Sequence, residues 1–85
     1  MKIIYSTKFA REYKKLPLKV KKAAEKKEKI FRGNPFDPIL KAHKLTGKLK
    51  EYYSFSIDYE YRIIFEFFKK DIIWFHFIGT HEIYK

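Results

Sequence analysis

Cysteine is absent from the chain, and glycine and proline are scarce, with three of each. Without thiols the protein has neither a disulfide framework nor a thiolate metal site. No repeat or low-complexity segment breaks the sequence. The apolar run at the N-terminus is far shorter than a signal peptide, and the apolar stretch 72–78 is too short to cross a bilayer. We therefore expect a cytoplasmic protein that does not contact membranes.

The remaining composition predicts a small folded domain. Apolar residues make up 46% and aromatic residues 20% of the 85 positions, a composition too hydrophobic for a disordered chain. A chain of this length buries only a modest core and leaves little room for a cofactor cavity. We therefore expect one domain over residues 1–85 that uses no cofactor.

Charge is divided unevenly along the chain. The formal net charge is +10, yet residues 1–50 carry sixteen lysines and arginines against four acids, while residues 51–85 carry four against six. Eight lysines lie between positions 14 and 29, where the pattern fits either a solvated helix face or a binding surface. A basic surface attracts a polyphosphate backbone or an acidic protein. Our candidates for RNA binding are Lys19, Lys22, Lys26, Lys44 and Lys48.

The first half of the sequence predicts a strand followed by two helices. Residues 1–5 favour a strand, and Ser6 or Thr7 is placed to cap the helix behind it. That helix ends before Pro17, which in turn suits the first turn of a second helix. The second helix ends at Gly33-Asn34-Pro35. We expect a helix hairpin that lies on a sheet, followed by a loop over residues 35–48.

The second half predicts three strands, because apolar residues alternate with polar ones through residues 49–57, 61–67 and 73–77. The connections around residues 58–60 and 69–71 are too short for parallel crossovers, so the strands are antiparallel neighbours. The predicted fold class is α+β, with an N-terminal strand and a two-helix hairpin packed on an antiparallel β-sheet.

The alternation also assigns side chains to the two faces of the sheet. Odd positions from 53 to 77 are nearly all large and apolar, which marks the face under the helices. A simple solvated face would carry more threonine, lysine and glutamate than the even positions do, so we regard the opposite face as a candidate site. Its side chains are Ser54, Ser56, Arg62, Trp74 and His76.

Three of these side chains have a structural alternative. Arg62 is either paired with Glu60 or Glu66 or available to a phosphate. His76 between two phenylalanines is typical of a half-buried core histidine. Trp74 is more typical of packing than of a base-stacking platform.

Motifs for metal and nucleotide chemistry are missing. There is no Gly-rich phosphate loop and no helical HExxH, and the three histidines do not pair at zinc-ligand spacing. RNA cleavage would then use the RNA's own 2′-OH as nucleophile, with a base, an acid at the leaving 5′-oxygen, and cations over the phosphorane. Residue types able to supply these parts are His81, Tyr84, Arg62, His43 and Lys44. For His81 the alternative is a surface loop histidine, and for Tyr84 a frayed terminus.

Four segments together resemble the RelE/ParE toxin superfamily of type II toxin–antitoxin modules from bacteria and archaea. The resemblance covers the whole chain, including the order of its elements. It implies a microbial-ribonuclease-like fold and, in the RelE, YoeB and YafQ branches, cleavage of mRNA in the ribosomal A site without a metal. The segments are His43-Lys44-Leu45-Thr46-Gly47-Lys48-Leu49, Tyr52-Tyr53-Ser54, Tyr61-Arg62-Ile63-Ile64-Phe65 and Gly79-Thr80-His81-Glu82-Ile83-Tyr84.

The resemblance implies a role for each matching position. Arg62 matches a phosphate-binding arginine, His81 matches the catalytic histidine of YafQ-like members, and Tyr84 approximates the C-terminal aromatic that orients the substrate base. His43 falls at a position where these toxins often have a histidine, and Asp58 matches a position near an acidic residue implicated in the YafQ-like branch, so both are supporting catalytic candidates.

The implied function is a ribosome-dependent mRNA endoribonuclease that inhibits translation and uses His81 as acid or base. Its implied partners are mRNA, the ribosome with its RNA, and a cognate acidic antitoxin that forms a hetero-oligomer with it. Two alternatives stay open, a non-catalytic gyrase-inhibiting toxin of the ParE type and a degenerate module that only binds an antitoxin.

Overall fold

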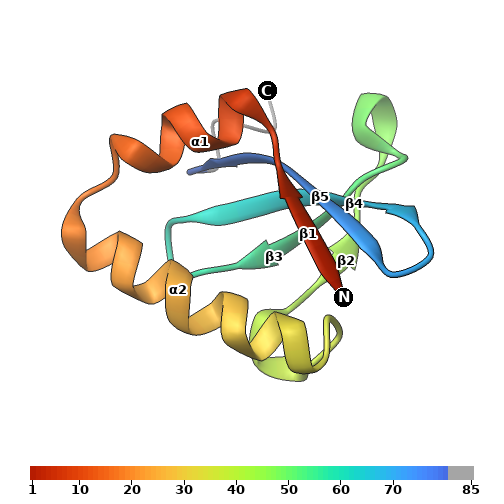
Figure 1. The fold of residues 1–85 in the computed structure, drawn as a ribbon, viewed down its shortest axis with the longest axis horizontal. Coiled ribbons are helices and arrows are strands. Elements are labelled where there is room, and N and C mark those ends of the chain that lie inside the picture. The colour runs from red at the N-terminus through yellow and green to blue at the C-terminus, as the bar shows by residue number, and fades with distance from the viewer. Residues whose placement is uncertain (81–85) are drawn as a thin grey trace.

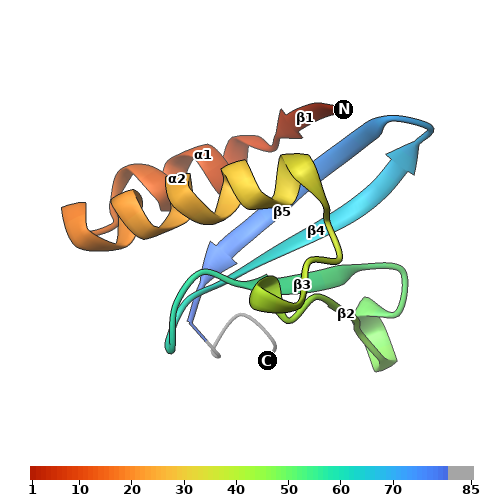
Figure 2. The same cartoon turned by 90° about the horizontal axis from the view of Figure 1, so that it is seen from below.

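The computed structural model describes residues 1–80 of the chain. These residues form an α+β structure in which two helices cover one face of a sheet (Figures 1 and 2). No helix in residues 1–80 is long and apolar enough to span a membrane. The elements in chain order are β1 (Lys2–Tyr5), α1 (Thr7–Lys14), α2 (Leu18–Gly33), the 3₁₀-helix η1 (Pro38–Leu40), β2 (His43–Lys44), the 3₁₀-helix η2 (Gly47–Leu49), β3 (Tyr53–Ser56), β4 (Arg62–Lys69) and β5 (Ile72–Gly79).

The sheet has five strands in the order β1-β5-β4-β3-β2. Strands β3 to β5 pair antiparallel in the sequential manner predicted, and β2, which was not predicted, adds an antiparallel partner to β3. β1 instead pairs parallel with β5, from Lys2 opposite Ile72 to Tyr5 opposite Phe75. The fold class is as predicted, but the sheet is mixed rather than antiparallel. The chain between β1 and β5 contains both helices and three strands, a connection long enough for parallel pairing.

The helix boundaries follow the local signals in the sequence. Ser6 caps α1, and its Oγ accepts a hydrogen bond from the Phe9 backbone N–H at 2.9 Å. Pro17 separates the helices, and Asn34 ends α2 in an extended conformation. The ring of Phe31 in α2 is fully buried and packs against Phe55, Phe65 and Phe75 of three different strands, with centroid separations of 4.9–5.3 Å. The core therefore centres on this aromatic cluster.

Two side chains, of Ser6 and of Glu12, form hydrogen bonds with backbone groups of β5 that β1 leaves unpaired. Beyond Phe75, the Ser6 hydroxyl donates to the His76 backbone carbonyl at 2.7 Å. Further along the same edge, the Ile78 backbone N–H donates to Glu12 Oε1 at 3.2 Å. The side chains of the cap residue Ser6 and of Glu12 in α1 thus satisfy backbone groups of β5 that would otherwise need another strand.

A register shift between β4 and β5 changes the predicted assignment of faces. Ile64 lies opposite Phe77, whereas the next residue, Phe65, lies opposite Phe75, so β5 carries one extra residue, His76. The shift places Ile78 in the core, where the strict odd pattern expected Phe77. Phe67 lies opposite the core residue Ile73 and its ring contacts Tyr53 and Phe65, as the odd pattern expects, although its side chain is 39% exposed near the end of β4.

The segment predicted as a loop over residues 35–48 contains regular structure. It holds η1, the start of η2 and the short edge strand β2, in which His43 lies opposite Ser54. The predicted first strand also begins later than expected, because Leu49 belongs to η2 and β3 starts at Tyr53.

Truncation of Phe31 tests the importance of the aromatic core. We expect Phe31→Ala to lower the free energy of unfolding by about 3–5 kcal/mol, because it removes a ring that contacts three strands. Urea denaturation followed by circular dichroism measures the change. The control is Tyr59→Ala at a side chain that is 94% exposed, for which we expect a change within about 0.5 kcal/mol. Equal losses for the two variants would contradict this description of the core.

Candidate functional site

Arg62 is the first residue of β4 and lies between two neighbouring strands. It is opposite Ser56 of β3 and Gly79 of β5. Since side chains alternate along a strand and Ile63 enters the core, Arg62 projects from the sheet face away from the helices. Ser56 shares that face with Arg62, as predicted.

The guanidinium of Arg62 contacts backbone carbonyls. Its Nη1 donates to the carbonyls of Asp58 at 3.1 Å and Tyr61 at 3.3 Å. Within residues 1–80 it has no carboxylate partner, and Glu66 instead pairs with His76 Nε2 at 2.7 Å. Pairing of Arg62 with either Glu60 or Glu66 is therefore not observed, and its positive charge is held in place without being neutralised by these acids.

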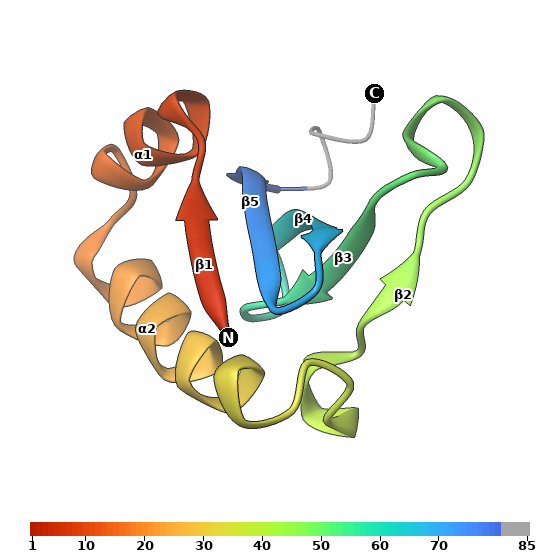
Figure 3. The ribbon, with the colours of Figure 1, turned by 45° about the vertical axis from the view of Figure 1, so that its right-hand side comes forward.

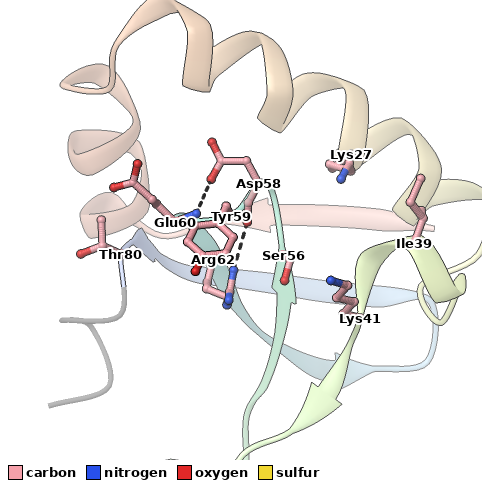
Figure 4. A pocket seen from close by; sticks show the side chains of 9 residues that line it. All are labelled: Lys27, Ile39, Lys41, Ser56, Asp58, Tyr59, Glu60, Arg62 and Thr80. Atoms are coloured by element: carbon pink, nitrogen blue, oxygen red, sulfur yellow. Dashed lines mark hydrogen bonds between the residues drawn. The ribbon is translucent and has the colours of Figure 1, made fainter.

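A hollow of about 840 Å³ opens beside Arg62, at the end of β3 that β2 leaves unpaired (Figure 4). Lys27 of α2 and Lys41 of the η1–β2 connection line it from the side opposite the β3–β4 turn. The other lining residues are Ile39, Ser56, Asp58, Tyr59, Glu60 and Thr80. Three cations from three separate elements and the carboxylates of Asp58 and Glu60 thus border one space, in which the cations outnumber the acids.

Sequence reasoning did not single out Lys27 and Lys41, which are separated by fourteen positions in a chain rich in lysine. Lys27 is half-buried while the other lysines around it on α2 are mostly exposed. Lys41 has a left-handed backbone with φ of 53°, which is uncommon for a residue other than glycine. No sequence signal separates them from the solvated lysines, because only the fold brings them to Arg62.

Arg62 also borders a second hollow, of about 580 Å³, on its other side. His43, Lys48 and the residues from Leu45 to Leu49 line this second hollow. The His43 Nδ1 donates to the Lys41 carbonyl oxygen at 3.2 Å, so Nε2 is the ring nitrogen left for other contacts. The structure therefore brings together His43, Lys48 and Arg62, which the sequence analysis proposed separately, while Lys44 is exposed and lines neither hollow.

Asp58 has a structural task in the β3–β4 turn. Its Oδ1 accepts hydrogen bonds from the backbone N–H groups of Glu60 at 2.9 Å and Tyr61 at 2.8 Å. Such a carboxylate holds a turn in the manner of an Asx motif. Asp58 also lines the larger hollow, in which Arg62 lies.

His76 and Trp74 belong to an aromatic cluster on the same face of the sheet as Arg62, closer to the β4–β5 turn. The His76 ring lies between Tyr52 and Trp74, with centroid separations of 4.8 Å and 4.9 Å. The Trp74 Nε1 is buried and has no hydrogen-bond partner within residues 1–80. Since His76 is half-buried and paired with Glu66, the interpretation of both rings as packing residues agrees with their contacts.

The other predicted residues are distributed as follows. Lys19, Lys22 and Lys26 are exposed on α2. His81 and Tyr84 lie outside the described residues, and Thr80, which lines the larger hollow, immediately precedes His81 in the sequence. Residues 1–80 contain no group of three or more histidine or acidic residues arranged to hold a metal ion.

Comparison with solved structures finds toxins of the predicted superfamily. A YoeB toxin from Staphylococcus aureus, solved as a dimer, is 25% identical, with a TM-score of 0.77 over 95% of this chain and 97% of that chain. A YoeB/ParE toxin from Agrobacterium tumefaciens is 16% identical, with a TM-score of 0.80 over 95% and 99%. YafQ from Escherichia coli is 20% identical, with a TM-score of 0.74 over 96% and 94%. The resemblance to the RelE/ParE superfamily and the predicted fold are confirmed.

The likeness resides in the fold, since no protein-family model and no curated protein sequence matches the chain. Two further matching structures hold their toxins in complexes, a DinJ-YafQ toxin–antitoxin complex from E. coli and a YoeB-YefM complex from S. aureus.

Replacement of Asp58 tests its structural role in the β3–β4 turn. We expect Asp58→Ala to lower the free energy of unfolding by about 1 kcal/mol, because two backbone N–H groups lose their acceptor. Asp58→Asn keeps an oxygen at that position and should stay within about 0.5 kcal/mol of wild type in the same urea titration. Equal destabilisation by both variants would show that the charge of Asp58, rather than its turn contacts, stabilises the fold.

Proposed function

We propose that this chain, which has the fold of the RelE/ParE toxin superfamily, is a single-domain toxin that cleaves mRNA on the ribosome and is neutralised by an antitoxin. The observation that carries the proposal is the arrangement around Arg62, whose charge is unpaired by carboxylates within residues 1–80 and borders two hollows lined by further cations. The solved complexes of YafQ and YoeB with their antitoxins support the partner part of the proposal.

The proposed reaction is attack of the RNA 2′-OH on the adjacent phosphorus. A base removes the hydroxyl proton, the P–O bond to the 5′-oxygen breaks, and an acid protonates that oxygen. The products are a 2′,3′-cyclic phosphate and a 5′-hydroxyl. Negative charge increases on the non-bridging oxygens as the phosphorane forms, and a fixed guanidinium stabilises that charge more than it stabilises the ground state.

Roles follow from position and chemistry. Arg62 binds the scissile phosphate, since its guanidinium is preorganised by two backbone carbonyls. His81 serves as acid or base, as the family resemblance implies, and His43, whose Nε2 is left for other contacts, is the supporting group for the other proton transfer. Tyr84 orients the nucleotide. The exposed lysines Lys19, Lys22 and Lys26, together with Lys44, bind ribosomal RNA through charge alone.

Replacement of the Arg62 guanidinium tests the catalytic proposal. We expect Arg62→Ala to lower the rate of mRNA cleavage by about 10²–10³-fold, and Arg62→Lys to recover only part of it because an ammonium cannot make the bidentate contact. His81→Ala should lower the rate by about 10²–10⁴-fold. Induced expression followed by mapping of transcript 5′ ends measures the cuts, which should follow the codon phase. Lys70→Ala, which removes an exposed cation from the β4–β5 turn, is the matched control.

Unchanged cleavage in both variants would contradict the assigned roles. Growth arrest with a DNA-damage response and no new 5′ ends would favour the gyrase-inhibiting alternative. Normal growth on expression of the wild-type chain would favour the degenerate antitoxin-binding module.

Lys27 and Lys41 give a separate test of the larger hollow. If the RNA strand occupies it, Lys27→Ala and Lys41→Ala should each weaken binding of a short single-stranded RNA and each reduce the slope of log K against log salt by about one. Fluorescence anisotropy at salt concentrations from about 50 to 200 mM measures the slope, because phosphate contacts weaken strongly over this range. Lys70→Ala is again the control, and equal effects of all three substitutions would indicate general electrostatic attraction only.

A further inference from the structure

Tyr59 lies in the β3–β4 turn and has no side-chain partner within residues 1–80. Its side chain is 94% exposed, more than any other large apolar residue in that part of the chain. Neither its ring nor its hydroxyl makes a ring contact or hydrogen bond there. Four other tyrosines each pack against a further aromatic ring, namely Tyr5, Tyr13, Tyr52 and Tyr53. Packing of the fold therefore gives no reason for an aromatic ring at position 59.

The backbone that carries Tyr59 is fixed on both sides. Asp58 Oδ1 accepts hydrogen bonds from the backbone N–H groups of Glu60 and Tyr61. The backbone carbonyl of Asp58 accepts the hydrogen bond from Arg62 Nη1 at 3.1 Å. The turn therefore holds the Tyr59 backbone in a set position relative to the guanidinium that we propose to bind the scissile phosphate.

The larger hollow has a cationic side and a turn side. Lys27 and Lys41 border it across from the turn, and the carboxylates of Asp58 and Glu60 border it beside Tyr59 (Figure 4). The cation at position 41 lies there because the chain runs from α2 through η1 to β2, the edge strand at the opposite side of the sheet from β1 (Figure 3). A phosphate in the hollow is attracted toward the cations and repelled from the acids of the turn. The part of a nucleotide suited to the turn side is therefore its uncharged base.

We propose that Tyr59 stacks on a base of the RNA strand whose phosphate lies at Arg62. The proposal rests on the ribonuclease function proposed above and adds a substrate-binding residue to it. Single-stranded RNA exposes the faces of its bases, and aromatic side chains stack on them in proteins that bind single strands. Every base has such a face, so the contact adds affinity without selecting a sequence. It requires an unpaired nucleotide, because neighbouring base pairs cover both faces of a base inside a duplex.

Fluorescence anisotropy with two matched strands on the intact protein tests the proposal. One strand is oligouridylate of about eight nucleotides, a length within the usual site sizes of small single-strand-binding domains. The other has the same number of stable abasic ribose phosphates, and therefore the same charge without bases. We expect Tyr59→Ala to weaken binding of oligouridylate about tenfold and to leave binding of the abasic strand unchanged. Tyr59→Phe, which keeps the ring, should bind both strands as wild type does.

A matched control and the salt dependence separate stacking from other effects. Phe68→Leu changes an exposed aromatic residue that lines neither hollow beside Arg62, and it should leave both affinities unchanged. Tyr59→Ala should not alter the slope of log K against log salt, because no phosphate contact is lost, whereas Lys27→Ala should reduce that slope by about one. Circular dichroism checks that each variant is folded.

Three results would overturn the stacking proposal and leave the ribonuclease function standing. One is equal binding of oligouridylate by Tyr59→Ala and wild type. Another is equal weakening of both strands by Tyr59→Ala, which would place the contact on the sugar–phosphate backbone. The third is a loss in Tyr59→Phe as large as that in Tyr59→Ala, which would assign the contact to the hydroxyl. Failure of the wild-type protein to bind either strand would instead overturn the RNA site beside Arg62 together with this proposal.

Discussion

The register between β3 and β4 is the constraint on which the site depends. It pairs Ser56 with Arg62, and the turn between them is held by Asp58 through two backbone hydrogen bonds. A slip of one residue would turn Arg62 into the core and expose Ile63, so the apolar pattern of β4 and the Asp58 turn must agree. They do agree, and the carbonyls of the same turn then orient the guanidinium. Fold and proposed chemistry therefore share one local structure.

Two regions of the surface differ in charge. Beside the end of β3, Arg62 joins Lys27 of α2 and Lys41 at the larger hollow, and it joins Lys48 at the smaller one. Between the helices, Glu25 and Glu28 border an apolar groove within a surface that is otherwise rich in lysine.

Features set by neighbouring residues were predictable from the sequence. The Ser6 cap, the break at Pro17 and the end of α2 near Gly33 all depend on contacts within a few positions. The extra residue His76 in β5, the two-residue strand β2 and the parallel pairing of β1 were missed, because each depends on a distant strand. The same holds for the site: Arg62 was identified from its strand position, whereas its backbone partners and the approach of Lys27 and Lys41 required the fold. The turn-forming role of Asp58 was visible in principle, as an aspartate at the start of a tight turn.

The most direct test of the central claim concerns the RNA rather than the protein. Ribosomes programmed with an mRNA that carries a single 2′-deoxy nucleotide immediately 5′ of a mapped cut should bind the protein normally but show no cleavage at that bond, because the proposed nucleophile is missing. The unmodified mRNA should give a 2′,3′-cyclic phosphate and a 5′-hydroxyl at the same position. Cleavage of the deoxy-substituted bond at the normal rate would contradict the account, since the nucleophile would then be something other than the RNA 2′-OH.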